Sequence, residues 1–324
     1  MVKLANAEMA EKKLATRAAF GATLAELAEE GVPVVAVDAD LTGSTTTKKF
    51  AAAAPENADK LFNCGIAEQN MIDVAAGLAL TGHVAYTGSF AVFGTGRAYD
   101  QIRNTVCYSN LDVKICPTHA GVSVGPDGGS HQMLEDVSLM RGLPNMRVLV
   151  PADYAAARAA IKLAAKTPGP VYVRMGRAAV PCVYDDDVEL EIGRAYVLRE
   201  GSDATVVACG VEIREALAAA DMLAEEGVSI EVIDAFSVKP LDEDTITASV
   251  AKTGCCVVAE EHSVHGGLGS AVAECLARKN PAPCEFVGVQ DRFGKSGEFE
   301  ELLGYFNLDA AAIVEAVKRA RGRK

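Results

Sequence analysis

The sequence lacks the cysteine and histidine spacings that bind metals or form redox pairs. It contains nine cysteines and five histidines in 324 residues, but it has no C-x-x-C pair and no Cys/His spacing that suits zinc. Most cysteines lie inside apolar runs, such as TVVACG at 205–210. We therefore expect buried, reduced thiols in a cytoplasmic protein.

Long apolar segments and excess positive charge are also missing. The start of the chain is charged and has no continuous apolar run, and no stretch of 18 uncharged apolar residues occurs, so we expect neither a signal peptide nor a membrane span. The formal net charge is −13, which argues against nucleic acid as a partner. An anionic substrate would need a local cluster of Arg and His.

Short apolar runs alternate with helical patterns along the whole chain. Those of the first half lack polar alternation, which is typical of strands buried on both faces of a parallel sheet. The predicted strands are 34–39, 61–64, 84–87, 113–117, 147–150 and 171–174, and the predicted helices are 16–30, 67–81, 97–108, 134–141 and 154–166.

A charged stretch at 182–204 interrupts this pattern, and we interpret it as a linker followed by an entry strand. A second series follows, with strands at 205–209, 229–233, 255–259 and 285–289 and helices at 212–226, 243–252, 268–278 and 310–320. The sequence therefore predicts an α/β protein of two consecutive domains with mainly parallel sheets, at 1–185 and 186–324.

Two common phosphate-binding motifs are missing, G-x-x-x-x-G-K-[ST] and a G-x-G-x-x-G that opens a helix. The glycine run at 266–269 precedes a predicted helix, where an anion could bind, but we favour a tight turn or a subunit contact. We assign no role to His262 or His265.

Polar and aromatic side chains follow four of the predicted strands. Because ligands bind beyond the carboxyl ends of parallel strands, we expect these side chains to converge on one edge of the first sheet. They are Glu68, Phe90, Phe93, His119, His131 and Arg174.

The segments that carry these residues resemble, in order and separation, the pyrimidine-binding domain of the transketolase family. The strongest signals are GIAEQNM at 65–71 and THAGVSVGPDGGSHQ at 118–132. The second half resembles the family's C-terminal domain through its strand–helix pattern and the run from Glu261-His262 to Gly269. The resemblance implies thiamine diphosphate as cofactor, bound between two domains that usually belong to different subunits.

The resemblance also implies that half of the enzyme is elsewhere. The family holds the cofactor's diphosphate and its Mg²⁺ through a G-D-G-type motif, and Gly-Asp-Gly does not occur in this chain. We therefore expect the C-terminal subunit of a split transketolase, without a metal site of its own. A separate N-terminal subunit would supply the diphosphate and metal domain, in an A2B2 assembly. The expected reaction moves a two-carbon ketol unit from a ketose phosphate to an aldose phosphate.

By this resemblance Glu68 engages N1′ of the aminopyrimidine, so that the cofactor's 4′-imino group can deprotonate the thiazolium C2. Phe90 and Phe93 would flank the pyrimidine ring. The alternatives are an exposed acid at a helix start for Glu68 and ordinary core packing for the two phenylalanines.

The same resemblance places His119 and His131 beside the substrate, where imidazoles bind oxygens and relay protons. Asp127 would contact a sugar hydroxyl. The alternative is that these loop residues are simply solvated.

Arg17, Ser44 and Arg174 match positions that grip the sugar phosphate, with His131 nearby, since guanidinium groups form forked bonds to phosphate. The alternatives are a solvated helix residue for Arg17 and a structural ion pair for Arg174.

Three other functions remain open from the sequence. Two are thiamine-diphosphate enzymes: the beta subunit of a 2-oxo-acid dehydrogenase, and a deoxyxylulose-phosphate synthase-like protein. The third is a non-catalytic scaffold, against which Glu68, Phe93 and both histidines argue.

Overall fold

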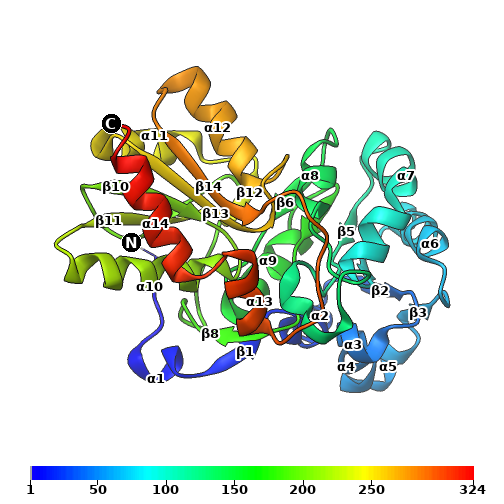
Figure 1. Cartoon of the computed structure of the whole chain (residues 1–324). Helices are drawn as coiled ribbons and strands as arrows, with labels where there is room; N and C mark the ends of the chain where they lie inside the picture. Colours follow the sequence, from blue (N-terminus) through cyan, green and yellow to red (C-terminus); the bar gives the residue numbers. More distant parts are fainter. Residues whose placement is uncertain (1) are drawn as a thin grey trace.

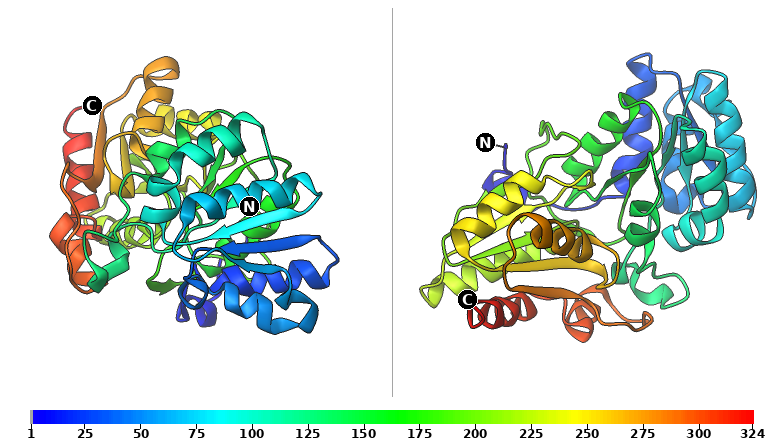
Figure 2. Two further views of the ribbon diagram at one scale, coloured as in Figure 1. Left: turned by 90° about the vertical axis from the view of Figure 1, so that its right-hand side faces the viewer. Right: turned by 90° about the horizontal axis from the view of Figure 1, so that it is seen from above.

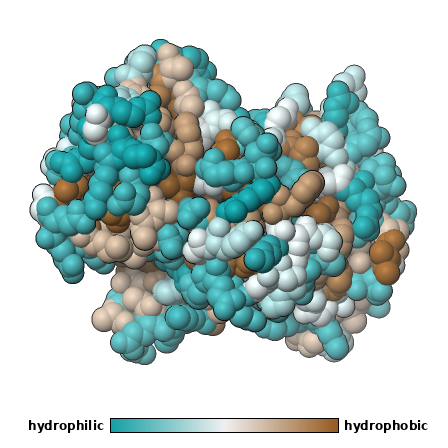
Figure 3. Space-filling model, in the orientation of Figure 1, coloured by the Kyte–Doolittle hydropathy of each residue, from teal (hydrophilic) through white to brown (hydrophobic). Residues whose placement is uncertain are grey.

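The computed structural model describes residues 2–324, which form two α/β lobes side by side (Figure 1). The first lobe has a seven-stranded sheet in the order β12-β6-β7-β5-β4-β2-β3, and the second a five-stranded sheet in the order β14-β13-β10-β11-β9. In both views of Figure 2 the blue-to-cyan helices between residues 18 and 80 and the red C-terminal helix lie at opposite sides of the molecule. The face in Figure 3 is largely hydrophilic, with a notch between the lobes at its upper edge. The predicted fold class is confirmed.

Six parallel strands form the body of the first sheet. Alternate residues of β2 enter different cores: Val34 and Ala36 pack under α2 and α9, whereas Val35 and Val37 pack under α6. Burial on both faces explains why such strands read as continuous apolar runs. The strands are β2 (Val34–Asp38), β3 (Leu61–Asn63), β4 (Val84–Gly88), β5 (Val113–Ile115), β6 (Arg147–Leu149) and β7 (Val171–Val173).

The helices of the first lobe lie on both faces of its sheet (Figure 1). The longer ones are α2 (Ala18–Glu29), α6 (Glu68–Leu80), α8 (Asp136–Arg141) and α9 (Tyr154–Ala165). Shorter elements are α1 (Ala7–Ala10), α3 (Thr42–Thr45), α4 (Thr47–Ala53), α5 (Pro55–Ala58) and a 3₁₀ helix at Val122–Asp127, with β1 (Lys13–Ala15) paired antiparallel to β8 (Ala179–Pro181).

The second lobe repeats this plan. Its parallel strands are β10 (Ala204–Ala208), β11 (Ile230–Asp234), β13 (Cys256–Ser263) and β14 (Cys284–Val289), with β9 (Tyr196–Arg199) antiparallel at one edge as the entry strand. The helices are α10 (Glu212–Glu225), α11 (Glu243–Thr253), α12 (Leu268–Lys279), α13 (Phe299–Phe306) and α14 (Ala310–Arg321). The sequence pattern did not predict α13.

Strand β12 (Ser237–Lys239) connects the two lobes through backbone hydrogen bonds, in addition to the linker between them. It follows β11 in the second half of the chain, yet it pairs antiparallel with β6 at the edge of the first sheet. The backbone N–H of Val150 donates to the carbonyl of Phe236 at 2.9 Å, which extends this contact.

The segment 97–108 differs from the single α-helix that we expected. A short α7 (Tyr99–Gln101) lies between two π-helical segments, Val92–Arg97 and Ile102–Tyr108. π-Helical turns often occur at functional sites, and here the first carries Phe93 and Arg97. The other predicted strands and helices are present, with ends shifted by a residue or two, except that the strand predicted at 255–259 continues to Ser263 as β13.

Within residues 2–324 no helix is both long and apolar enough to cross a membrane. All nine cysteines are free, and only Cys64 and Cys284 are partly exposed. The expectation of buried thiols is confirmed for the other cysteines, and burial raises the pKa of Cys107 to about 11.

We predict that Phe236→Ala lowers the free energy of unfolding by about 3–5 kcal/mol, because it empties part of a core that both lobes share. Urea denaturation followed by circular dichroism measures the loss. Phe293→Ala is the matched control, since Phe293 is 93% exposed and its replacement should change stability by less than about 0.5 kcal/mol. Equal effects of the two substitutions would contradict the prediction.

Candidate active site

Glu68 is the first residue of α6, and its side chain is only 2% exposed. The chain reaches it from β3 through a turn at Gly65, whose φ of +68° favours glycine. Its Oε2 lies 2.8 Å from Nη1 of Arg97. Arg97 was not among the residues that we expected, although a buried carboxylate calls for a charged partner.

Two aromatic rings lie beside this ion pair. The centroids of Phe90, which follows β4, and Phe93 are 6.1 Å apart, with an interplanar angle of 14°. The guanidinium of Arg97 covers Phe93 at 4.5 Å from the ring centroid. A carboxylate, a cation and an aromatic face are thus in continuous contact.

His119, which follows β5, joins this cluster through its ring. The imidazole stacks on Phe90 with 3.8 Å between centroids. Its backbone φ of +61° is unusual for a residue other than glycine, and such strain is concentrated at functional sites. Burial, with smaller effects of Arg17, Arg177 and His131, lowers the pKa of His119 to about 3. The imidazole is therefore neutral at physiological pH, with Nδ1 at 2.8 Å from the hydroxyl of Thr118.

His131 meets the same rings edge-on. Its centroid lies 5.3 Å from that of Phe93 and 6.2 Å from that of Phe90. Its Nδ1 is 2.9 Å from the hydroxyl of Ser130. His131 thus lies next to both predicted aromatic residues, and His119 lies next to Phe90.

A second cluster, of cations, borders His119. Arg17 donates from Nη1 to the backbone carbonyl of Ser44 at 2.8 Å, and Arg177 donates from Nη1 to the carbonyl of Val124 at 3.0 Å. Burial lowers the pKa of Arg17, and the nearby Arg177 lowers it further, while Asp127 opposes both effects. Two guanidinium groups that repel each other are stabilised by an anion between them.

Arg174 does not fit the phosphate-binding role that we expected for it. Its side chain is 7% exposed, and its Nε lies 2.7 Å from Oδ2 of Asp136. Its Nη2 donates to Oδ1 of Asp136 at 3.1 Å and to the carbonyls of Met133 and Glu261 at 3.4 and 3.0 Å. These bonds hold the guanidinium of Arg174 in a buried structural ion pair, so that it is not directed towards a phosphate.

The cation at the site is Arg177 instead, three residues further on. The predicted strand ended at residue 174, whereas β7 ends at Val173 and the chain then turns towards the site. The sequence does show Arg177 shortly after this predicted strand, and this second arginine could have been considered as the phosphate ligand.

Asp127 lies exposed at the end of the 3₁₀ helix, close enough to influence Arg17. Among residues 2–324 no group of three or more His, Cys, Asp or Glu side chains is arranged to hold a metal ion.

Comparison with known proteins identifies the two lobes. Residues 12–183 match the model of the transketolase pyrimidine-binding domain, and residues 193–313 match that of the transketolase C-terminal domain.

Related chains match this one over most of its length. A protein of Methanocaldococcus jannaschii named as a transketolase C-terminal section is 45% identical over 93% of this chain and 94% of its own. A 6-deoxy-6-sulfo-D-fructose transketolase subunit of a Clostridium species is 42% identical over 93% of this chain and 92% of its own.

A solved structure of a split-gene transketolase, an inactive β4 tetramer, is also similar. It superimposes with a TM-score of 0.87 at 48% identity, over 96% of this chain and 99% of its own. The chain belongs to the transketolase family, in which it corresponds to the C-terminal subunit of the split form.

Proposed function

We propose that this chain is the C-terminal subunit of a thiamine-diphosphate-dependent transketolase that moves a two-carbon ketol unit from a ketose phosphate to an aldose phosphate. The observation that carries the proposal is the joining of two clusters at His119. The Glu68–Arg97–Phe93–Phe90 contacts reach it through the stacking of Phe90 on its ring. Arg17 and Arg177 are near enough to lower the pKa of His119.

The residues present fit the aminopyrimidine part of the cofactor. Phe90 and Phe93 offer aromatic faces, and Glu68 offers a buried carboxylate for a ring nitrogen. When bound, thiamine diphosphate supplies the electron sink that carbon–carbon cleavage requires. Glu68 would hold a proton at N1′ of the pyrimidine. Its present partner, Arg97, would keep it oriented.

The histidines and arginines of this chain would bind the sugar phosphate. His119 is neutral, so its Nε2 can donate to or accept from a substrate oxygen without the cost of desolvating a charge. His131 would bind a neighbouring oxygen and relay a proton. Arg17 and Arg177 would take the phosphate, with the backbone of Ser44 holding Arg17 in place. Asp127, near Arg17, would contact a hydroxyl.

A partner subunit would complete the site by holding the diphosphate and Mg²⁺, in an A2B2 complex of the cytoplasm. The names of the relatives support a two-subunit enzyme, because they describe a C-terminal section and a subunit. The Arg17–Arg177 cluster favours a sugar phosphate over a 2-oxo acid, which has no phosphate to bind.

We predict that the purified chain alone has no transketolase activity and that activity appears when the N-terminal subunit is added. The assay uses xylulose 5-phosphate and ribose 5-phosphate with thiamine diphosphate and Mg²⁺. Turnover by the chain alone would contradict the division of the site between subunits. A mixture that binds the cofactor but is silent with these sugars would point to another ketose phosphate or to a 2-oxo acid.

In the reassembled complex, Glu68→Gln should lower kcat by about 10²–10⁴-fold, because it removes the group that handles the proton at N1′. Glu56→Gln makes the same change of charge at an exposed site on α5 and should leave kcat unchanged. Thermal unfolding of each variant is the control for folding. A Glu68→Gln enzyme that unfolds like the parent and retains its kcat would refute the assignment.

We predict that Arg177→Ala weakens substrate binding, whereas Arg174→Ala lowers the stability of the fold. The first removes charge-assisted bonds to phosphate and should raise KM for the sugar phosphates by about 10- to 100-fold, with little change in stability. The second leaves Asp136 buried without its cation and should cost about 3–5 kcal/mol of stability. Steady-state kinetics and urea denaturation separate these effects. The opposite pattern would restore Arg174 as the phosphate ligand.

A further inference from the structure

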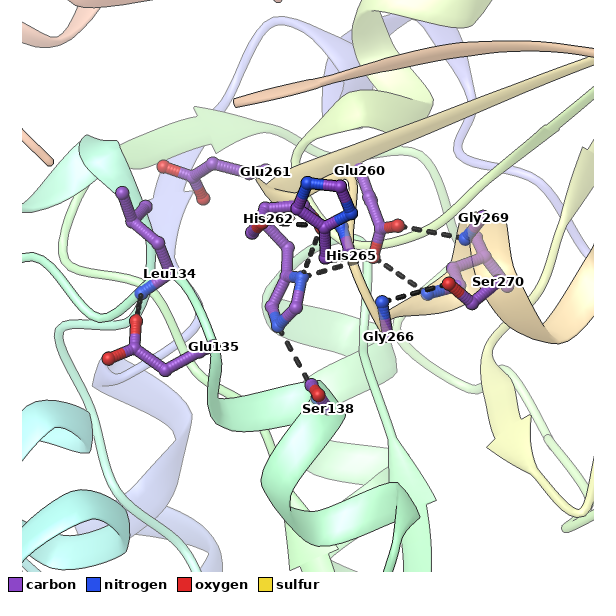
Figure 4. A network of polar contacts seen from close by, with 12 residues as sticks. Leu134, Glu135, Ser138, Glu260, Glu261, His262, His265, Gly266, Gly269 and Ser270 are labelled. Atoms are coloured by element: carbon purple, nitrogen blue, oxygen red, sulfur yellow. Dashed lines mark hydrogen bonds and ion pairs between the residues drawn. The ribbon is translucent and has the colours of Figure 1, made fainter. Parts of the chain in front are cut away.

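A carboxylate of the second lobe reaches the loop that carries His119. Glu261 lies near the end of β13 and is 3% exposed. Its Oε1 accepts a hydrogen bond from the backbone N–H of Ser123, and its Oε2 lies 4.0 Å from Nη1 of Arg174. Figure 4 shows this carboxylate pointing away from that of Glu260, as expected for successive residues of a strand.

The neighbours of Glu261 in β13 are engaged elsewhere (Figure 4). Glu260 accepts from the N–H groups of Leu268 and Gly269 at 2.7 and 2.8 Å, so it fills the N-terminus of α12 that an external anion would need. His262 accepts at Nε2 from the N–H of Ser138 at 3.4 Å.

The loop 118–123 approaches Glu261 closely. Gly121 has a φ of +78°, and a Cβ added there would overlap the Glu261 carboxylate. The rest of the loop is held by the first lobe: the N–H of Ala120 donates to the carbonyl of Met175 at 3.2 Å, and that of Gly121 donates to the carbonyl of Met133 at 2.9 Å. Glu261 is therefore the support on the remaining side.

This contact lies where the second sheet would bind a ligand of its own. β10 has β11 on one side and β13 on the other, so the chain reverses its direction of winding there, and open α/β sheets bind ligands beyond the carboxyl ends of such strands. Here the first lobe fills this crevice. Glu261 bonds to Ser123 and Arg174, and the N–H of Gly210 donates to the carbonyl of Val150 at 3.3 Å.

We propose that Glu261 is a positioning residue of the active site, which acts from the second lobe on the loop 118–123 and thereby fixes the imidazole of His119 against Phe90. The proposal rests on the proposed function in so far as His119 contacts the substrate. Glu261 itself touches neither His119 nor any reacting group; it acts through the Ser123 N–H and the close approach at Gly121.

The charge of Glu261 depends on a small set of buried groups. Burial raises the pKa of its carboxyl to about 7, Arg174 and Ser123 oppose this rise, and Asp136 adds to it. Glu212, at the start of α10, is a further acid that faces it, and burial raises the pKa of Glu212 well above its usual range. The bond to Ser123 therefore gains its charge-assisted character as the pH rises through about 7 and weakens as the pH falls through that value.

The contribution of Glu261 to folding stability changes with pH in the opposite direction to the strength of its bond to Ser123. A carboxyl whose pKa rises on folding stabilises the fold below its ordinary pKa of 4.5, and this contribution is lost as the pH rises through about 7. Loop positioning and global stability can thus be told apart by their pH dependence.

The test compares Glu261→Ala and Glu261→Gln with the control Glu212→Gln in the reassembled complex. Glu212 is equally buried, and within residues 2–324 neither of its carboxylate oxygens has a hydrogen-bond partner. We expect Glu261→Ala to lower kcat/KM for the ketose phosphate about tenfold or more near pH 8, and less near pH 6. Glu261→Gln keeps an acceptor for Ser123, so it should recover part of the activity but lose the pH dependence near 7. Glu212→Gln should leave kcat/KM near pH 8 unchanged, because the Ser123 N–H and Gly121 contact Glu261 and not Glu212.

Hydrogen exchange of the chain alone gives a readout that does not need turnover. Peptides that cover 118–128 should exchange about tenfold faster in Glu261→Ala than in the parent, with Glu261→Gln in between. Unchanged exchange, or faster exchange with an unchanged pH profile of kcat/KM, would overturn the proposal. If the complex has no transketolase activity at all, the proposed function fails, and the exchange rates alone decide whether Glu261 fixes the loop.

Discussion

The arrangement of the two lobes depends on one buried cation. Arg174 lies just beyond β7 and bonds to Asp136 at the start of α8 and to the backbone of Glu261 in β13. The hydroxyl of Tyr172 donates to the same Asp136 at 2.5 Å. A buried charge is tolerated only when its partners are held in place. The strand, the helix and the second lobe therefore fix one another, and the loops between them have little freedom.

This network is consistent with the proposed binding of an anionic substrate by a protein with a net charge of −13. Arg174 is neutralised by its acidic partners, whereas Arg17 and Arg177 bond to backbone carbonyls and keep their charge for a ligand. In the proposed function, the local arginine pair and not the net charge of the surface attracts the phosphate. Arg174 and Arg177 are three residues apart but differ in their surroundings: Arg174 is buried in an ion pair with Asp136, whereas Arg177 lies beside the site.

Much of the fold could be predicted because a strand that is buried on both faces is a continuous apolar run in the sequence, independently of which strands lie beside it. The site edge followed from the same strands, since Glu68, Phe90, Phe93 and His119 lie within the five residues that follow β3, β4 and β5. Three features could not be read locally. The choice between Arg174 and Arg177 depends on where β7 ends. The π-helical turns around α7 depend on which carbonyl each backbone N–H bonds to, which the pattern of apolar residues did not reveal. The pairing of β12 with β6 joins residues about ninety positions apart and leaves no local signal.

That pairing also limits how the molecule can move. In many two-domain enzymes a linker acts as a hinge, and the domains close over a bound substrate. Here a rotation of one lobe against the other would tear β12 from the first sheet and uncover the edge of β6. We therefore expect the two lobes to move together. Substrate entry and release must then depend on the loops around the site, or on the approach and withdrawal of another subunit.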